Sequence, residues 1–251
     1  LKLYPVPEVR NDLKQNTSDL SDLLKKYHSS IGDGWEIGEN WIQKKIHEFL
    51  DQKGSKYKDE RNFPSIDGCS KLSPYLNTGV ISSKWCLNEA AKRNNGELSE
   101  GDRGIVHWVS EILWREFYRH IIYNFPKVSK NKPFLDYTDK MVWSDNHAFF
   151  EAWKKGKTGI PIVDAGIREM LSTGWMHNRT RMIVAMFLSK NLLIDWRWGE
   201  EFFMNNLIDG DIASNNGGWQ WSASTGTDAA PYFRIMNPMT QSERFDPEGK
   251  Y

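Results

Sequence analysis

The sequence predicts an all-α fold, and three observations support this prediction. Apolar residues recur at intervals of three and four along most of the chain, which is the period of a helix. Capping residues, glycines and prolines mark the ends of these segments. No segment combines strict apolar–polar alternation with β-branched residues, as a strand would. We therefore expect one helical domain over residues 36–251, preceded by a connecting segment over residues 1–35.

The first 35 residues are polar and are interrupted by prolines and glycines. One amphipathic stretch, residues 18–27, carries Leu20, Leu23 and Leu24 at helical spacing and predicts a short helix. The start of the chain has neither the apolar stretch of a signal peptide nor an initiator Met. We therefore expect a fragment of a longer chain.

Two helices are expected in the first half of the domain. The first begins near Glu39 and stops at Gly54, since glycine favours the end of a helix. Its apolar face consists of Trp41, Ile42, Ile46, Phe49 and Leu50. Ser82 or Ser83 predicts the N-cap of a second helix that continues through Ala91.

Four further helices are expected after residue 100. The first of them ends at Phe125 and Pro126, and the next begins at Pro161 and ends at Gly174. The apolar face of the first is Ile105, Trp108, Val109, Ile112, Leu113 and Phe117. The last two helices are predicted from Met182, Ile183, Met186, Phe187 and Leu193, and from Phe202, Phe203, Met204 and Leu207.

Composition excludes several classes of protein. The 33 basic and 33 acidic residues cancel, so a DNA footprint must be local rather than a uniformly basic coat. No apolar run approaches the roughly 18 residues of a membrane span. Cys69 and Cys86 are too few for a disulfide framework, which favours a reducing compartment. His107, His120 and His177 lack the spacing of a zinc site, so we expect no metal.

The 12 tryptophans are unusually many for 251 residues. Either they form a large aromatic core, or some of their rings stack on a ligand, stack on bases or carry electrons. Two of them, Trp219 and Trp221, lie in the small and polar segment 209–228. On a helix they point about 200° apart, so one can face a buried cofactor while the other faces an open cavity.

Three other polar segments each allow two interpretations. Ser70 and Ser73 before Pro74 suit a phosphate at a helix entry, or they simply cap the helix. A helical stripe either lines a cavity or is a solvated face with an ion pair between Glu111 and Arg115. The stripe is Trp108, Glu111, Arg115 and Tyr118. A run of basic residues either binds phosphates or ends a helix. The run is Arg168, Arg179, Arg181, Lys190 and Arg197, against Glu169 and Asp195.

Four motifs together resemble a known family. They are residues 114–119 (WREFYR), 159–166 (GIPIVDAG), 174–182 (GWMHNRTRM) and 215–221 (NNGGWQW), the last leading to PYFR at 231–234. They are similar to the flavin-binding domain of the photolyase/cryptochrome family, most closely to class I bacterial cyclobutane pyrimidine dimer photolyases. The resemblance runs from about Trp35 to Tyr251. It implies that the family's α/β antenna domain and its last helices lie outside this sequence.

The resemblance implies a helical domain that holds a U-shaped FAD. In this family the reduced FAD absorbs light and passes an electron to a flipped-out pyrimidine dimer, which splits. The implied partner is DNA that contains such dimers. The implied protein is a cytoplasmic bacterial monomer acting on the nucleoid, without membrane contact. A second antenna pigment, of folate or deazaflavin type, is expected only in the full-length protein.

The resemblance also assigns residues to the cofactor site. Cys69 replaces the usual Thr, which puts one hydroxyl contact in doubt, and Asn215 matches the residue beside flavin N5. An amide there can accept a hydrogen bond from the reduced flavin. The cofactor positions are Tyr57, Cys69, Ser70, Lys71, Leu72, Ser73, Trp108, Arg115, Asn178, Arg181, Asp209, Gly210, Asp211 and Asn215.

Catalysis and DNA binding are assigned by the same resemblance. Glu111 matches the acid that hydrogen-bonds the dimer, and Trp114 and Trp221 match the walls on which it stacks. The implied catalytic residues are Glu111, Asn215 and the electron chain Trp219, Trp196 and Trp143. The implied DNA contacts are Arg61, Glu111, Trp114, Tyr118, Asn178, Arg179, Met182, Trp221 and Gln241.

Three alternatives remain at this point. A cryptochrome senses light without repair, but its plant and animal types tend to carry Asp and Cys at the position of Asn215. Enzymes that repair pyrimidine–pyrimidone adducts use a second His in the segment 177–182, where this chain has Met182. An inert helical scaffold would not retain FAD, so a yellow protein would exclude it.

Overall fold

The computed structural model describes residues 34–251, so the short helix expected at residues 18–27 lies outside the described residues. Over residues 34–251 the regular structure is helical, apart from one isolated parallel bridge between Ser144 and Ile194. This confirms the predicted all-α class. No helix in this part of the chain is long and apolar enough to cross a membrane.

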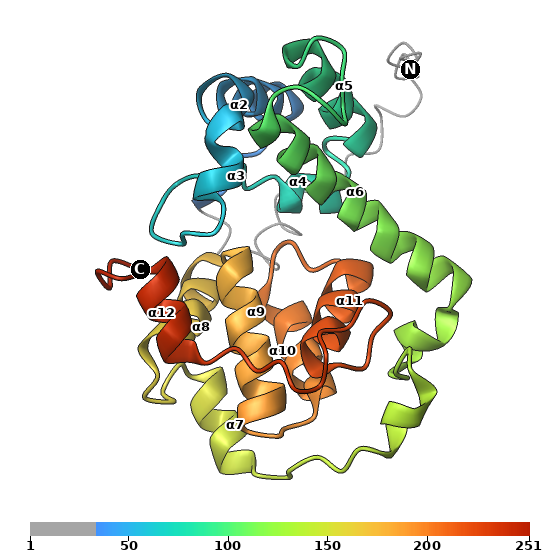
Figure 1. Cartoon of the computed structure of the whole chain (residues 1–251), viewed down its shortest axis with the longest axis vertical. Helices are drawn as coiled ribbons and strands as arrows, with labels where there is room; N and C mark the ends of the chain where they lie inside the picture. Colours follow the sequence, from blue (N-terminus) through green and yellow to red (C-terminus); the bar gives the residue numbers. More distant parts are fainter. Residues whose placement is uncertain (1–33) are drawn as a thin grey trace, which may run out of the picture.

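The described helices form two lobes, one above the other in Figure 1. The N-terminal lobe comprises α2 (Glu39–Gln52), α3 (Tyr57–Glu60), α4 (Ser73–Asn77), α5 (Ser83–Arg93) and the long α6 (Arg103–Asn124). The C-terminal lobe comprises α7 (His147–Lys154), α8 (Pro161–Thr173), α9 (Asn178–Met186), α10 (Trp196–Asn206), α11 (Ile212–Ala223) and α12 (Pro238–Phe245). The segment 125–146, with two 3₁₀ turns (Pro126–Lys130 and Asp136–Lys140), joins them along one side.

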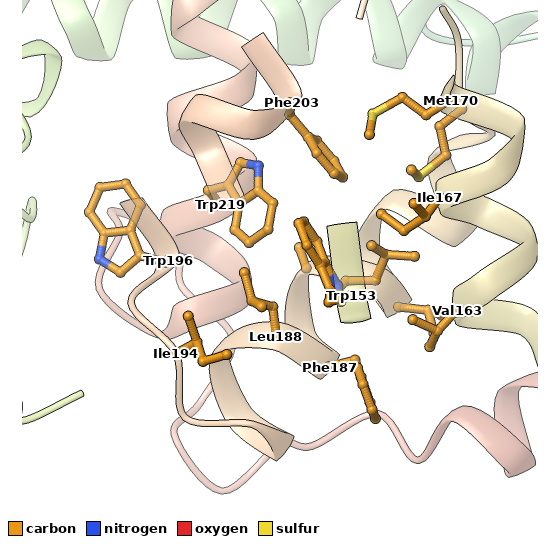
Figure 2. Packing of buried hydrophobic residues seen from close by; sticks show 14 of the residues in the cluster. Trp153, Val163, Ile167, Met170, Phe187, Leu188, Ile194, Trp196, Phe203 and Trp219 are labelled. Atoms are coloured by element: carbon orange, nitrogen blue, oxygen red, sulfur yellow. The ribbon is translucent and has the colours of Figure 1, made fainter. Parts of the chain in front are cut away.

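Each lobe has its own apolar core. The buried residues of the N-terminal cluster all lie between Ile42 and Ile112, and those of the other between Trp153 and Ala223. Figure 2 shows the second cluster, in which the Trp219 ring packs against Phe203, with ring centroids 4.9 Å apart. A side chain at Gly199 would collide with the Trp219 ring, so α10 and α11 approach closely only because this residue is glycine.

The predicted helix ends are confirmed where capping residues marked them. The Ser82 side chain accepts a hydrogen bond from the Trp85 amide and caps α5, as predicted. Asp102, which was not predicted, caps α6. Pro161 is the first residue of α8, and Gly174 follows its end with φ 69°, a left-handed conformation that glycine adopts readily.

The helix predicted from Met182 to Leu193 is wrong at its end. Regular α9 stops at Met186 and continues as a π-helix over Phe187–Asn191. The wider π turn shifts the apolar register, because it adds a residue to the turn. Leu193 consequently leaves the core: it has φ 55° and is 57% exposed, while its neighbour Ile194 is buried.

Candidate functional site

Polar side chains join the two lobes where their facing ends meet. Asn77 Nδ2 on α4 donates to the carbonyl of Gly210, 2.8 Å away. Arg119 on α6 forms an ion pair with Asp211, with Nη2 and Oδ2 3.2 Å apart. The residues that the resemblance assigns to the cofactor come from both sides of this junction, which Figure 1 shows between α4, α6, α9 and α11.

The segment 69–73 faces two indole rings. Ser70 Oγ accepts from Trp108 Nε1 at 3.2 Å, and Ser73 Oγ accepts from Trp175 Nε1 at 3.3 Å. Neither hydroxyl caps α4, whose N-cap residue Leu72 makes no side-chain capping bond. The simple capping interpretation is therefore wrong: each hydroxyl oxygen accepts an indole N–H, and its own O–H is left to donate to a ligand. Leu72 is 3% exposed and its side chain packs into the core, so only its backbone is available to a ligand.

Cys69 lies against His177 at the start of α9. The Cys69 sulfur and His177 Nε2 are 3.5 Å apart, and His177 Nδ1 accepts from the amide of Arg179. The proton of a neutral imidazole must then sit on Nε2 and face the thiol. Burial raises the pKa of Cys69 to about 11 and lowers that of His177 to about 4. The pair is therefore a neutral thiol and a neutral imidazole.

The polar stripe of α6 faces the junction, but its ion pairs differ from the expected one. Glu111 pairs with Arg61 at the end of α3, and Arg115 donates to the carbonyl of Leu76 at 2.9 Å. The expected pair between Glu111 and Arg115 is thus wrong, because Arg61 beside α3, which packs on α6, pairs with Glu111, while Arg115 pairs with its neighbour Glu116 at 3.0 Å. The ring of Trp114 is 43% exposed beside this stripe.

Tyr57 and Tyr118 complete the N-terminal side. Tyr57 is buried, with the Arg61 guanidinium 5.3 Å from its ring centre. Burial raises the pKa of Tyr57, so its hydroxyl stays protonated. Tyr118 packs on Gly217 of α11, where any side chain would collide with its ring. This contact fixes the distance between α6 and α11.

A buried ion pair holds the turn before α11. Arg181 Nη2 on α9 donates to both carboxylate oxygens of Asp209, at 3.1 and 2.8 Å, and the Asp209 side chain is 3% exposed. Asp211 caps α11 through the Ser214 amide. Burial opposes ionisation of Asp211, but the bonds from Ser214 and Arg119 outweigh it and lower its pKa.

Asn215 is oriented by the neighbouring helix. Its Nδ2 donates to the backbone carbonyl of Glu200 at 3.0 Å, so the amide oxygen is the atom it can offer to a ligand. The next residue, Asn216, donates to the Glu200 carboxyl at 2.9 Å and accepts from Gln220. Burial raises the pKa of Glu200, and the Asn216 amide and the charge of Arg197 offset this effect only in part.

The three tryptophans assigned to electron transfer lie in or beside the C-terminal core. Trp219 is 2% exposed, Trp196 is fully buried, and Trp143 packs partly buried against the same cluster. Figure 2 shows Trp219 and Trp196 in the same cluster of buried residues. Trp143 precedes Ser144, whose amide bonds the Leu193 carbonyl at 2.7 Å, so it lies near the start of α10. Trp221 is half-buried and outside this cluster.

One of the assigned DNA contacts, Arg179 on α9, lies over an aromatic ring of α12. The Arg179 guanidinium lies 4.2 Å from the centre of the Phe245 ring and donates to Asn62 at 2.6 Å. Arg179 Nε and Gln241 Oε1 are buried, and no described residue hydrogen-bonds either atom. Asn178 is exposed at the start of α9, with its amide 4.0 Å from the sulfur of Met182.

The predicted basic patch over residues 168–197 does not form as a unit. Arg168 donates to the Gly156 carbonyl, Lys190 to the carbonyls of Pro231 and Arg234, and Arg197 pairs with Asp195 and Asp139. Only Arg179 and Arg181 reach the junction, because their helix positions face it. The other three basic side chains are held by carbonyl and carboxylate acceptors away from the junction.

The sequence analysis did not predict the residues that hydrogen-bond to the assigned site residues, directly or through one another. They are Asn77, Trp175, His177, Glu200, Asn216 and Gln220. The sequence does not reveal that the carboxyl of Glu200 is buried, because the charged residues around it in the sequence are of the same kind. The GWMHN motif did include Trp175 and His177, but without a role for either.

The residues at the junction fit a flavin dinucleotide. Both lobes offer hydroxyl, guanidinium and amide groups there. His, Cys, Asp and Glu side chains form no metal-binding group within residues 34–251. Helical lobes with such a junction define a helical flavin-binding domain.

Comparison with known proteins identifies the family. Residues 108–251 match the model described as the FAD binding domain of DNA photolyase, which is more than half of the chain, and the chain therefore belongs to this family. A relative from Salmonella typhimurium, named deoxyribodipyrimidine photo-lyase, is 47% identical over 249 residues, 98% of this chain and 52% of its own length. One from Escherichia coli with the same name is 53% identical over 206 residues, 82% of this chain and 43% of its own length.

Solved structures agree with this assignment. A class III photolyase from Agrobacterium tumefaciens is 39% identical with a TM-score of 0.80, covering 100% of this chain and 50% of that protein. A cryptochrome from Synechocystis is 36% identical with a TM-score of 0.79, over 86% of this chain and 45% of that protein. The chain thus spans about half the length of the curated relatives named here.

Proposed function

We propose that this chain is the FAD- and lesion-binding part of a light-driven DNA repair enzyme that splits cyclobutane pyrimidine dimers. Residues 36–251 form its helical domain, and residues 1–35 connect that domain to the rest of the protein. The observation that carries the proposal is the oriented amide of Asn215. The names of the relatives, deoxyribodipyrimidine photo-lyase, support the same activity.

FAD would be held between the lobes. The Arg181–Asp209 pair, the Ser70 and Ser73 hydroxyls and the Asp211 turn are its candidate partners. When bound and reduced, FAD supplies the photoexcited electron for dimer splitting. The bond from Asn215 Nδ2 to Glu200 leaves the amide oxygen to accept a hydrogen bond, so this residue would favour a protonated nitrogen on the cofactor.

The lesion would enter beside Glu111. Its carboxylate is kept in place by Arg61 and can accept hydrogen bonds from the bases. The rings of Trp114, 43% exposed, and of the half-buried Trp221 offer stacking surfaces for the two pyrimidines. Arg179 contributes charge for the DNA backbone. A damaged pair stacks poorly, which lowers the cost of flipping it out of the duplex.

Electrons for reducing the cofactor would pass through Trp143, Trp196 and Trp219. Trp219→Phe should block photoreduction of oxidised FAD by an external reductant, because Phe is much harder to oxidise. Repair by FAD that is already reduced should continue, since that electron leaves toward the lesion. Absorption spectra under illumination measure the first, and a dimer-repair assay measures the second. Normal photoreduction in the variant would remove Trp219 from the path.

The remaining parts of the proposal concern the whole protein. DNA containing pyrimidine dimers is its partner, and it acts as a monomer on the bacterial nucleoid in the cytoplasm. An antenna pigment of folate or deazaflavin type would bind outside these residues. The Sulfolobus tokodaii photolyase, described with two FAD molecules and a novel light-harvesting cofactor, is 38% identical with a TM-score of 0.74.

The decisive experiment is repair by this chain after reconstitution with reduced FAD. Duplexes with one thymine dimer are incubated in light and in darkness, and dimer content is measured. We expect loss of dimers in light alone. A flavin-loaded protein that repairs nothing would favour the cryptochrome alternative, and a protein that gains no flavin absorption above the free-dye control would contradict the site itself.

A further inference from the structure

The Trp219 ring has a tryptophan neighbour that the assigned electron chain does not include. Its centroid lies 6.1 Å from that of Trp153 on α7, in an edge-to-face arrangement. Figure 2 shows these two rings next to each other in the C-terminal core. Within residues 34–251, Trp153 is the one tryptophan in ring contact with Trp219, whereas Trp196 belongs to the same cluster without such a contact. Trp153 is therefore a candidate for exchanging electrons with Trp219.

A line of aromatic rings continues from Trp153 to the surface. Phe150 on the same helix stacks on Trp153, with centroids 5.8 Å apart, and contacts Trp198 on α10 at 5.2 Å. Trp198 is half-buried and stacks on the exposed His147, with centroids 5.0 Å apart. Because Trp153 itself is fully buried, these contacts connect the interior of the C-terminal lobe with solvent.

The hydrogen bonds of the two buried indoles differ. Trp153 Nε1 donates to the Val184 carbonyl at 3.2 Å, whereas Trp219 Nε1 is buried and has no partner among the described residues. An indole that has lost an electron carries positive charge, which strengthens a hydrogen bond from its N–H. Trp153 is therefore the easier of the two rings to oxidise, and an electron vacancy (a hole) on Trp219 moves to it favourably.

Trp198 is suited to be the end of this path. A positive charge costs less beside water than in an apolar core, so the hole is more stable on the half-buried Trp198 than on Trp153. The Val184 carbonyl is not a base, and the oxidised Trp153 consequently keeps its proton and can pass the hole on. At the surface, by contrast, water can take the indole proton from Trp198.

We propose that Trp219 is a branch point for holes. One branch is the chain through Trp196 and Trp143, and the second runs through Trp153 to Trp198. This inference rests on the proposed function, because the oxidant is a photoexcited oxidised flavin at the junction.

The electron balance of the second branch involves an external thiol as the reductant. Trp219 loses one electron to the photoexcited flavin, Trp153 returns one to Trp219, and Trp198 returns one to Trp153. Trp198 then releases its indole proton to water and becomes a neutral radical. The thiol gives a hydrogen atom to this radical and restores the indole. One electron has then passed from the thiol to the flavin, and one proton to water.

Illumination of the FAD-reconstituted 251-residue chain carrying Trp196→Phe tests the second branch, because this change interrupts the first. Transient absorption detects a neutral tryptophan radical, and peptide mass spectrometry after illumination in air locates its oxidation products. We expect the radical to form and the products to lie at Trp198. Adding Trp198→Phe should abolish both signals. Trp85→Phe is the matched control, because Trp85 is also half-buried and stacked on a histidine, His47, but lies in the N-terminal lobe.

A second variant protects the test against misfolding. Phe150→Leu, added to Trp196→Phe, removes the aromatic ring that contacts both Trp153 and Trp198 and should reduce oxidation at Trp198. Circular dichroism identifies any variant that fails to fold, in which case the other variant decides. A Trp196→Phe protein that forms no tryptophan radical would overturn the proposal, as would a radical that persists unchanged without Trp198 or Phe150.

A flavin-free experiment separates this proposal from the proposed function. A ruthenium polypyridyl photo-oxidant attached at Asn215→Cys, one turn before Trp219 on α11, replaces the flavin. Cys69→Ser directs the label to this position, since Cys86 is buried. If the chain gains no flavin absorption but the label oxidises Trp198, the flavin site is wrong and the branch is supported. If neither the label nor bound flavin oxidises Trp198, the branch alone is overturned.

Discussion

The two lobes contribute different chemistry to the junction between them. The N-terminal lobe supplies hydroxyls and ion pairs from short segments and from the long α6, such as Ser70 and the Arg61–Glu111 pair. The C-terminal lobe supplies groups oriented by a dense aromatic core, such as Asn215, which lies one turn before the buried Trp219 on α11. We therefore expect substitutions in the C-terminal lobe to change both the stability of the fold and the properties of the cofactor. Substitutions in the N-terminal lobe should change mainly the binding of ligands.

The largest effect should come from the buried ion pair at the junction. Asp209→Asn leaves the Arg181 guanidinium without its carboxylate, and breaking such a pair costs about 3–5 kcal/mol. Urea unfolding measures the loss. The control is Asp136→Asn, which breaks the pair with Lys127 at a side chain that is 85% exposed. That change should cost less than about 1 kcal/mol, and equal losses in both variants would contradict the difference in burial.

A pH effect of similar size should come from His177. Its pKa falls from 6.5 unfolded to about 4 in the fold, where burial disfavours the charged form. The unfolded chain therefore binds more protons, so this stability is present above pH 6.5 and is lost as the pH falls toward 4. The difference of about 2.5 pKa units corresponds to roughly 3 kcal/mol.

Unfolding free energies at pH 4 to 7.5 for the native chain and His177→Gln provide the measurement. The native chain should lose more stability than the variant across this interval, since Gln does not titrate. His120→Gln is the control, because His120 is exposed on α6. Parallel pH profiles for all three proteins would show that His177 is not buried in its neutral form.

A smaller effect distinguishes stacking from charge in DNA binding. Trp221→Ala removes a stacking surface, so binding to a duplex with a thymine dimer should weaken by about 1–3 kcal/mol while undamaged DNA is bound as before. Arg179→Ala should weaken both duplexes alike and lower the slope of log affinity against log salt by roughly one. Salt titrations on both duplexes measure this. If Trp221→Ala weakened the two equally, Trp221 would have only a packing role.

The smallest expected change is a shift in redox behaviour. Asn215→Asp places a carboxylate where the flavin accumulates negative charge on reduction, which should disfavour the fully reduced form. Redox titration of the reconstituted proteins measures the potential, with Asn205→Asp as a control on the exposed side of α10. An unchanged potential in the Asn215 variant would argue against its assigned place beside N5.

The sequence was sufficient for the helical class and for most helix ends, because Ser82, Pro161 and Gly174 act through local geometry. It failed where tertiary packing decides. The π-helix after Met186 places Leu193 outside the core, and Glu111 forms its ion pair with Arg61 rather than with Arg115. Resemblance to the family supplied the site residues, but it could not supply the partners that orient them.

The connecting segment 125–146 is fastened by side chains that come much later in the chain. Asn216 donates to the Val128 carbonyl, and Gln220 accepts from the Phe134 amide and donates to the Lys132 carbonyl, across 86 to 88 residues of sequence. Contacts between such distant residues form slowly, because a long loop must close first. The segment should therefore gain its final hydrogen bonds only after α11 has formed, which would make its amide protection a late event in folding.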